Sequence, residues 1–209
     1  MNIKEFAQDD WGNGYFADKG LYVLNNAIQN CLCRKLVAWM SSDADCRWSA
    51  AGVGRDGGFQ LDFSIRRDQI AWLSGCENAA VIEYWEIMQW VREYINRTFY
   101  LGLFDYECHF AHYPVGAFYK KHLDAFADQN TEKGNRKLST ILYLNEDWQP
   151  GDGGELVIYK PGSDEELVRV EPRLGTLVMF LSEEFPHEVL PANKPRWSLT
   201  GWFRTRGGL

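Results

Sequence analysis

The second half of the chain is divided into short apolar runs by glycine and proline, and this division constrains the fold more than any other sequence feature. Residues with high β propensity dominate the runs 106–113, 137–145, 155–160, 166–171, 175–181 and 196–203. Turn residues lie between them, as at 114–116, 150–154 and 161–162. Many short strands at even spacing are typical of an antiparallel sandwich or barrel. The sequence therefore predicts a jelly-roll core, a double-stranded β-helix, over about residues 101–206.

The first hundred residues have mainly the periodicity of helices. Apolar residues recur at every fourth position from Ile28 to Met40, which predicts a helix with Asn26 as its N-cap. A second helix is predicted over 78–97, with Ile82 and Trp85 on its apolar face. We expect an α+β protein with a single domain over 1–209, in which a helical layer over about 1–100 packs on one sheet of the core.

Charge and composition exclude several classes of function. The net charge of −7 argues against a nucleic-acid partner, because phosphate binding normally requires a basic face. No run of 18 apolar residues suggests a transmembrane helix, and the N-terminus lacks the apolar region of a signal peptide. The five cysteines are odd in number and show no zinc-binding spacing, so reduced thiols are expected. We expect a cytoplasmic monomer with neither a nucleic-acid nor a membrane partner.

Three of the rare metal-binding side chains are placed so that they could share one ion. His122 and Asp124 are two residues apart, and residues i and i+2 of a strand point to the same face. His187 follows the predicted strand 175–181, and an antiparallel roll makes distant strands neighbours. Two histidines and one carboxylate form the facial triad of non-haem iron(II) oxygenases, which leaves three coordination positions open. A structural zinc site would instead close its coordination shell.

A carboxylate-binding residue follows the last histidine. Arg196 begins the run 196–203, and its planar guanidinium suits a bidentate pair with a carboxylate. Tyr143, inside the run 137–145, could add a hydroxyl to the same carboxylate. Together these residues predict a site that holds the far end of a dicarboxylate such as 2-oxoglutarate.

The stretches 65–73, 112–124, 141–159, 170–192 and 196–203 resemble the prolyl hydroxylase domain enzymes, the group that includes the animal oxygen sensors. The sequences YLNEDW, GGEL and PHEVLPA carry much of the likeness, which runs from about Gly52 to Arg204. A compact chain of this kind is similar to bacterial members of the group.

The resemblance implies a role for each matching residue. His122, Asp124 and His187 would bind iron(II). Other residues would surround 2-oxoglutarate, namely Arg196, Tyr143, Tyr113, Leu156 and Thr200. Arg136 and Trp202 would border the target proline, and a glycine-rich segment over 50–64, with Gly57 and Gly58, would close over the substrate.

The resemblance also implies the reaction. It suggests hydroxylation of a prolyl residue in a protein, with iron(II), 2-oxoglutarate and dioxygen as cofactors and ascorbate supporting turnover. Translation elongation factor Tu is the protein substrate that it suggests.

Other interpretations remain open. The same fold could oxidise another residue or a small molecule, because the fold and the metal site do not determine the substrate. A nucleic-acid demethylase is disfavoured, since Ser198 and Trp202 stand where that class has asparagine and arginine. A catalytically silent binding module is a further alternative. The intact triad argues against it, because a protein without catalytic activity would be free to lose these residues. His109 and His112 are predicted to be structural residues on opposite faces of one strand.

Overall fold

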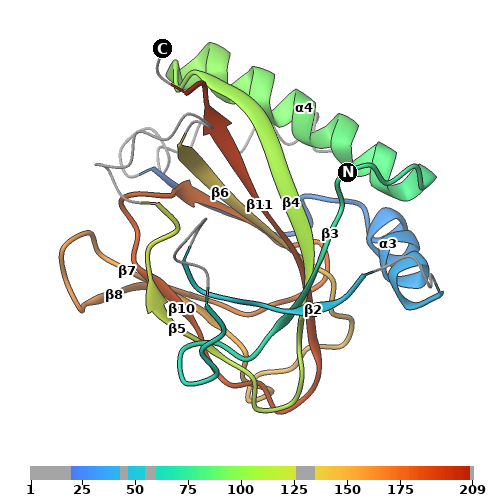
Figure 1. Cartoon of the computed structure of the whole chain (residues 1–209), viewed down its shortest axis with the longest axis vertical. Helices are drawn as coiled ribbons and strands as arrows, with labels where there is room; N and C mark the ends of the chain where they lie inside the picture. Colours follow the sequence, from blue (N-terminus) through green and yellow to red (C-terminus); the bar gives the residue numbers. More distant parts are fainter. Residues whose placement is uncertain (1–19, 43–46, 55–59, 126–134, 208–209) are drawn as a thin grey trace.

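The structure, a computed structural model, describes residues 20–42, 47–54, 60–125 and 135–207. Within these ranges it consists of two antiparallel sheets and two helices (Figure 1). The helices are α3 (Asn30–Ser42) and α4 (Ala79–Phe99). The strands are β1 (Leu21–Leu24), β2 (Ser49–Ala50), β3 (Gln69–Trp72), β4 (Leu103–Tyr113), β5 (Tyr119–His122), β6 (Arg136–Tyr143), β7 (Leu156–Tyr159), β8 (Glu166–Val170), β9 (Leu177–Leu181), β10 (His187–Val189) and β11 (Arg196–Thr205).

The strands form a larger and a smaller sheet whose order differs from their order in the chain. The larger sheet has the order β1-β9-β6-β11-β4-β3-β2, and the smaller has the order β5-β10-β7-β8. Apart from β7 and β8, which pair with each other in the smaller sheet, successive strands of the second half therefore alternate between the sheets, as in a double-stranded β-helix. The predicted fold class is confirmed.

The central strands of the larger sheet are buried on both faces. On β6 the side chain of Ile141 joins the cluster between the two sheets, while Leu138 and Leu142 join the cluster under the helices. The same division occurs on β9, where Val178 faces the smaller sheet and Met179 faces the helices. This two-sided burial explains why β9 and the end of β6 are apolar at successive positions rather than at alternating ones.

Both helices lie against the outer face of the larger sheet, and α4 runs along β4 (Figure 1). Asn78 caps α4, because its side chain accepts a hydrogen bond from the backbone N–H of Ala80. The predicted apolar face of this helix is partly wrong. Ile82 is 45% exposed, and Val81 and Tyr84 are buried instead. Contact with the sheet determines which side of α4 is buried. The buried side is centred on the positions next to Ile82.

The start of the first helix is also corrected. α3 begins at Asn30 rather than at Ala27, and Asn26 has a left-handed φ of 55°, so it belongs to a turn and is not an N-cap. The predicted apolar positions from Ile28 to Met40 are nevertheless buried. The periodicity therefore identified the buried face correctly, although it missed the first residue of the helix.

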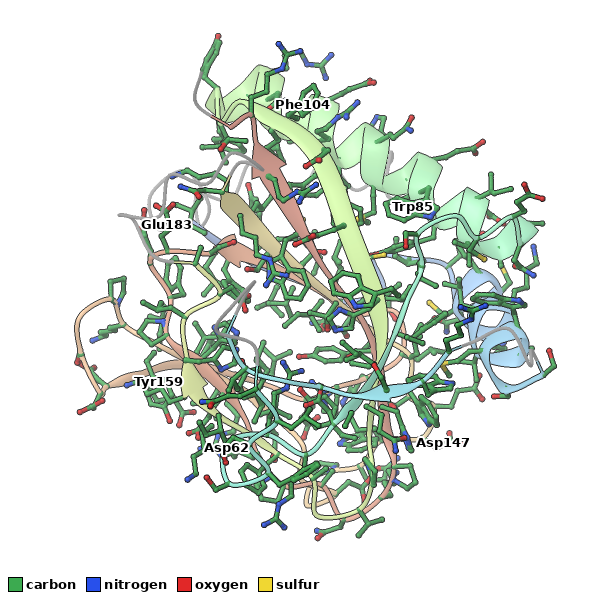
Figure 2. The ribbon with its side chains drawn as sticks, viewed as in Figure 1. Asp62, Trp85, Phe104, Asp147, Tyr159 and Glu183 are labelled. Carbon is green, nitrogen blue, oxygen red and sulfur yellow. The ribbon has the colours of Figure 1, made fainter. Side chains whose placement is uncertain are left out.

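No helix in the described part of the chain has both the length and the apolar character needed to cross a lipid bilayer. Figure 2 places Trp85 on α4 and Phe104 near the start of β4, whereas Tyr159 lies on the smaller sheet. The larger sheet therefore separates the helices from the smaller sheet.

Gly201 on β11 leaves room for an aromatic ring beneath α4. A Cβ atom at this position would lie 2.3 Å from the hydroxyl oxygen of Tyr106. That hydroxyl is hydrogen-bonded to Tyr84 at 2.9 Å and to Thr140 at 2.7 Å. The three hydroxyls join α4, β4 and β6 through a partly buried contact.

We predict that Gly201→Ala lowers the free energy of unfolding by about 1–3 kcal/mol, because the ring of Tyr106 must move. Urea denaturation measures this change. In a Tyr106→Ala background the contacts with the ring are gone and the contact with Cβ of Cys108, 2.7 Å from the added methyl group, remains, so the cost should be smaller. An equal cost in both backgrounds would contradict this explanation.

Candidate metal centre

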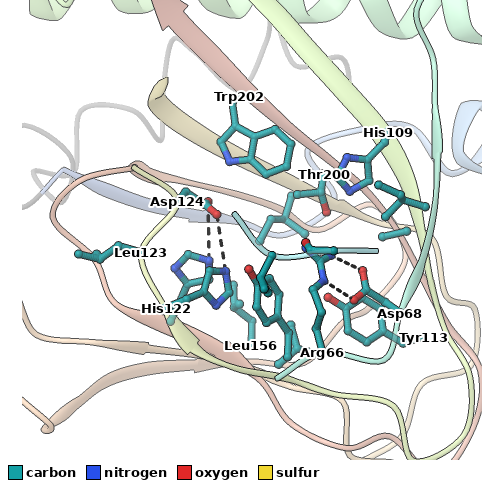
Figure 3. A pocket seen from close by; sticks show the side chains of 18 of the residues that line it. Arg66, Asp68, His109, Tyr113, His122, Leu123, Asp124, Leu156, Thr200 and Trp202 are labelled. Atoms are coloured by element: carbon teal, nitrogen blue, oxygen red, sulfur yellow. Dashed lines mark hydrogen bonds and ion pairs between the residues drawn. The ribbon is translucent and has the colours of Figure 1, made fainter. Parts of the chain in front are cut away.

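A cavity of 770 Å³ lies between the two sheets and contains most of the residues that the sequence singles out. Its wall comes from both sheets and from the segment before β3, as Figure 3 shows for eighteen of the residues. The lining includes His122, Asp124, His187, Arg196, Tyr113, Leu156, Thr200, Arg136 and Trp202. The jelly roll thus brings together residues from distant parts of the chain.

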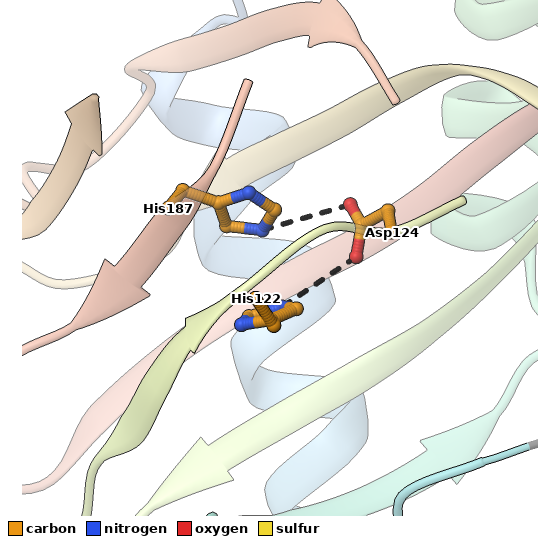
Figure 4. Close-up of side chains that lie close together, drawn as sticks. All are labelled: His122, Asp124 and His187. Carbon is orange, nitrogen blue, oxygen red and sulfur yellow. Dashed lines mark ion pairs between the residues drawn. The ribbon is translucent and has the colours of Figure 1, made fainter. Parts of the chain in front are cut away.

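Two histidines meet because their strands are neighbours in the smaller sheet. In the pairing of β5 with β10, His122 lies directly opposite His187. The Nε2 atom of His122 lies 3.6 Å from Oδ1 of Asp124, and Nε2 of His187 lies 3.7 Å from Oδ2 (Figure 4). One donor atom from each residue lies within 4.8 Å of the others.

Backbone carbonyls orient both imidazole rings. Nδ1 of His122 lies 2.8 Å from the carbonyl oxygen of Lys120, and Nδ1 of His187 lies 2.9 Å from that of Phe185. A carbonyl only accepts, so Nδ1 of each ring carries the proton in these bonds. The Nε2 lone pairs are then directed towards Asp124, which is the tautomer that binds a metal.

The buried members of this triad favour the ionisation state that a metal requires. Desolvation, together with the neighbouring His122, lowers the pKa of His187 to about 4. Burial would raise the pKa of the Asp124 carboxyl, but His187 and His122 outweigh burial and hold this pKa well below its ordinary value. At neutral pH His187 is therefore neutral and Asp124 is charged, as metal ligation demands.

Asp124 is oriented differently from the expected strand geometry. The strand β5 ends at His122, and Asp124 lies in a bend beyond it. Its Oδ2 atom accepts a 2.6 Å hydrogen bond from the hydroxyl of Ser139 on β6. The i, i+2 spacing therefore identified the right pair of residues, but the contact with β6 positions the carboxylate.

A stack of side chains supports His122 from the other side. The ring of Tyr119 lies parallel to His122, with centroids 3.5 Å apart. The guanidinium of Arg66 lies 4.2 Å above the Tyr119 ring, and it forms a bidentate ion pair with Asp68 at 2.7 and 2.5 Å. This ion pair is almost fully buried and links the segment before β3 to the metal centre (Figure 3).

Arg196 is a buried cation in the cavity wall. The residue is 1% exposed, and its Nε donates a 2.9 Å hydrogen bond to the carbonyl of Gly154. Within the described ranges no carboxylate forms an ion pair with Arg196. A buried charge without a counter-ion is costly, so an anionic ligand would be strongly favoured here.

The remaining predicted neighbours of the dicarboxylate are arranged around Arg196. Tyr113 lies in the cavity wall, with its ring centroid 4.8 Å from the guanidinium carbon. Tyr143 is fully buried behind the wall at 4.9 Å, and no group in the described part of the chain bonds its hydroxyl. Leu156 on β7 and Thr200 on β11 line the cavity from its two sides.

The predicted substrate residues lie at another part of the same cavity. The guanidinium of Arg136 stacks 3.4 Å above the ring of Trp202 and forms a 2.8 Å ion pair with Glu107. Both Arg136 and Trp202 line the cavity. Gly57 and Gly58 fall outside the described residues.

Several wall residues were not predicted to belong to the site, and His109 is one of them. Its spacing from His112 predicts a structural residue, but the structure places it in the cavity beside Trp72 and Trp202. His112 lies on the other face, stacked on Trp197. Others are Arg66, Asp68 and Trp72. Strand periodicity could have identified His109, because it lies on the same face of β4 as Tyr113.

The donor set fits iron(II) and a bidentate oxo acid. Two neutral imidazoles and a carboxylate on one side of an ion leave positions for further oxygen ligands. The buried Arg196 offers a cation to a second carboxylate, and the hydroxyl of Tyr143, which has no partner within the described ranges, offers a donor. Chemistry at both ends of the cavity thus matches 2-oxoglutarate.

Comparison with known proteins agrees with this chemistry. The family model of the 2OG-Fe(II) oxygenase superfamily matches residues 108–204. A Pseudomonas putida prolyl-4-hydroxylase is 42% identical with a TM-score of 0.80, and the match covers 92% of this chain and 96% of that chain. A Trichoplax adhaerens prolyl hydroxylase, solved with a hypoxia inducible factor peptide fragment, is 26% identical with a TM-score of 0.76. This second match covers 91% of this chain and 86% of that chain.

Curated relatives are longer proteins. The hypoxia-inducible factor prolyl hydroxylase of Caenorhabditis elegans is 38% identical over 90 residues, which are 42% of this chain and 12% of that protein. Egl nine homolog 1 of Mus musculus is 29% identical over 150 residues, which are 66% of this chain and 35% of that protein. This chain therefore spans well under half of the length of either relative.

His109 should make folding sensitive to acid. Desolvation, with Arg66 and Arg136 nearby, lowers its pKa from 6.5 to about 3. Below pH 6.5 the unfolded chain takes up a proton that the folded protein excludes, so stability is complete above this pH and falls as pH drops. We predict a loss of roughly 1 kcal/mol per pH unit between pH 6 and 4.5 from this residue alone.

The measurement is urea denaturation of the wild type and His109→Phe at several pH values. Phenylalanine keeps a ring beside Trp72 but does not titrate. The free energy of unfolding of the variant should therefore fall by roughly 1 kcal/mol less per pH unit than that of the wild type. The other histidines are present in both proteins, and their contributions cancel in the difference. Parallel pH profiles would contradict the prediction.

Proposed function

Because the chain belongs to the 2OG-Fe(II) oxygenase superfamily and is of its prolyl hydroxylase type, we propose that it hydroxylates a prolyl residue of a protein substrate. The reaction uses iron(II), 2-oxoglutarate and dioxygen. One observation carries this proposal: the cavity combines an oriented His122–Asp124–His187 triad with Arg196, a buried cation that has no carboxylate partner in the described ranges.

The triad residues would hold the metal through Nε2 of His122, Nε2 of His187 and a carboxylate oxygen of Asp124. Iron(II) supplies the redox chemistry by which one atom of dioxygen enters a substrate C–H bond while the oxo acid is converted to succinate and carbon dioxide. The protein supplies orientation. The backbone bonds to Nδ1 and the stack of Tyr119 on His122 hold the ligands in place before any metal binds.

Arg196 and its neighbours determine the choice of oxo acid. The guanidinium would pair with the far carboxylate, and the hydroxyls of Tyr143 and Thr200 would add hydrogen bonds to it. Tyr113 and Leu156 would border the chain of the ligand between this carboxylate and the metal. An oxo acid without a second carboxylate would leave Arg196 buried and unpaired, so it should bind poorly.

The substrate would enter beside Arg136 and Trp202. Their stacked pair presents a flat aromatic surface and a cation at the part of the cavity that the dicarboxylate leaves free. An aromatic surface suits the apolar ring of proline, while the cation can bond a backbone carbonyl of the substrate. The segment 50–64, with Gly57 and Gly58, would exclude water by closing over this side.

We further propose translation elongation factor Tu as the protein substrate. The likeness to compact bacterial prolyl hydroxylases supports this choice, and a structure from Pseudomonas putida matches nearly the whole chain. The chain has a net charge of −7, so the partner is expected to be a protein rather than a nucleic acid.

The deciding experiment incubates the purified protein with iron(II), 2-oxoglutarate and elongation factor Tu, then admits dioxygen. We predict that succinate forms and that tandem mass spectrometry finds one added oxygen atom on a prolyl residue. His187→Ala should give neither product, because one metal ligand is lost. A parallel reaction with a bacterial cell extract identifies other protein substrates.

The outcomes test separately the choice of substrate, the choice of target residue and the oxygenase activity. Oxygen on a prolyl residue of another extract protein would overturn the choice of elongation factor Tu alone. Oxygen on a residue other than proline would overturn prolyl hydroxylation but leave an oxygenase. Failure to form succinate with iron bound would favour a binding module.

A second prediction concerns Arg196. Lysine keeps the charge but loses the bidentate fork and the bond to Gly154, so Arg196→Lys should raise the KM for 2-oxoglutarate about ten- to hundredfold. Release of carbon dioxide from labelled 2-oxoglutarate measures this change. The affinity for metal in the absence of 2-oxoglutarate should be unchanged, and a loss there would show that the substitution disturbs the whole cavity.

A further inference from the structure

Two buried serines stand behind the carboxylate of the triad. The hydroxyl of Ser139 on β6 lies 2.6 Å from Oδ2 of Asp124 and 2.9 Å from the hydroxyl of Ser182. Both serines are 0% exposed. A carboxylate can only accept, so Ser139 donates to Asp124 and is itself free to accept the proton of Ser182. The three groups form a short directed chain that ends on one oxygen of the ligand.

The same pair of elements also holds the backbone beside the ligand. The amide of Ala125 donates a 3.3 Å hydrogen bond to the carbonyl of Ser182, whose own amide bonds the carbonyl of Lys137. Since β5 ends at His122, the sheet does not position Asp124 directly. The end of β9 and the start of β6 therefore determine where the carboxylate points.

The two oxygens of Asp124 consequently have different environments. Oδ2 accepts the hydrogen bond of Ser139 and lies 3.7 Å from Nε2 of His187, whereas Oδ1 lies 3.6 Å from Nε2 of His122. Two-point binding of a metal would require both oxygens to turn towards the ion. That rotation would lengthen a 2.6 Å bond from a hydroxyl that close packing and Ser182 hold in place.

We propose that Ser139, braced by Ser182, is a positioning residue that makes Asp124 a one-oxygen ligand, with Oδ1 on the metal. This inference rests on the proposed binding of a metal ion by the triad. A two-oxygen Asp124 would occupy four coordination positions together with His122 and His187, leaving two on an octahedral ion. The oxo acid fills two positions, so only a one-oxygen ligand leaves a third position for dioxygen.

The test replaces iron with Co(II), whose visible spectrum reports the number and geometry of its ligands and which needs no turnover. Calorimetric titration gives the dissociation constant of Co(II) for each variant. We predict that Ser139→Ala weakens Co(II) binding about tenfold and changes the Co(II) spectrum, because the carboxylate is no longer held. Ser139→Thr keeps the hydroxyl and should restore both properties.

A matched control comes from the adjacent residue of the same strand. Thr140 is equally buried, but its hydroxyl faces the helices and bonds Tyr106. Thr140→Val removes a buried hydroxyl and its hydrogen bonds without touching the triad. It should lower stability while the Co(II) dissociation constant and spectrum remain those of the wild type.

Ser182→Ala provides an independent variant if Ser139→Ala does not fold, and it should weaken Co(II) binding to a smaller extent with the same spectral change. Crystals of the Mn(II) form of whichever variant folds should show Asp124 binding through both oxygens. Wild-type affinity and spectrum in the serine variants would overturn the inference alone. A wild-type protein that binds no Co(II) would overturn the proposed function as well.

Discussion

The site depends on the antiparallel pairing of β5 with β10. This pairing places His122 opposite His187 in the smaller sheet, and no local property of either segment could bring the two rings together. Backbone carbonyls within each segment then orient the rings. Because sheet hydrogen bonds and ring orientation both come from the backbone, the two imidazoles are prepared for a metal by the fold itself.

Burial gives this arrangement its chemical selectivity. The cavity removes water from His187 and Arg196, so the imidazole stays neutral and the guanidinium lacks solvent to compensate its charge. Both effects favour ligands of opposite character at two places: a cation among the triad and an anion beside Arg196. A molecule with one carboxylate for Arg196 and an oxo acid for the metal satisfies both.

Residues outside β10 provide the contacts that orient Asp124 and support His122. Asp124 follows β5 in the chain but takes its orientation from Ser139 of β6, and His122 is stacked on Tyr119 beneath Arg66. These contacts join both sheets and the segment before β3 at a single point. The metal centre is therefore a property of the closed jelly roll, because its ligands are oriented by contacts from both sheets.

The sequence by itself determined the residue types of the site and the strand character of the core. His122, Asp124, His187 and Arg196 could be selected because few side chains bind metals or carboxylates, and β-type runs at even spacing implied a jelly roll. The rest required tertiary contacts. Periodicity is local, so it could not show which neighbouring face of α4 meets the sheet or that Ser139 orients the carboxylate. Those features depend on packing between segments far apart in the chain, because neighbours in the close-packed interior, and not neighbours in the sequence, decide which side chains meet.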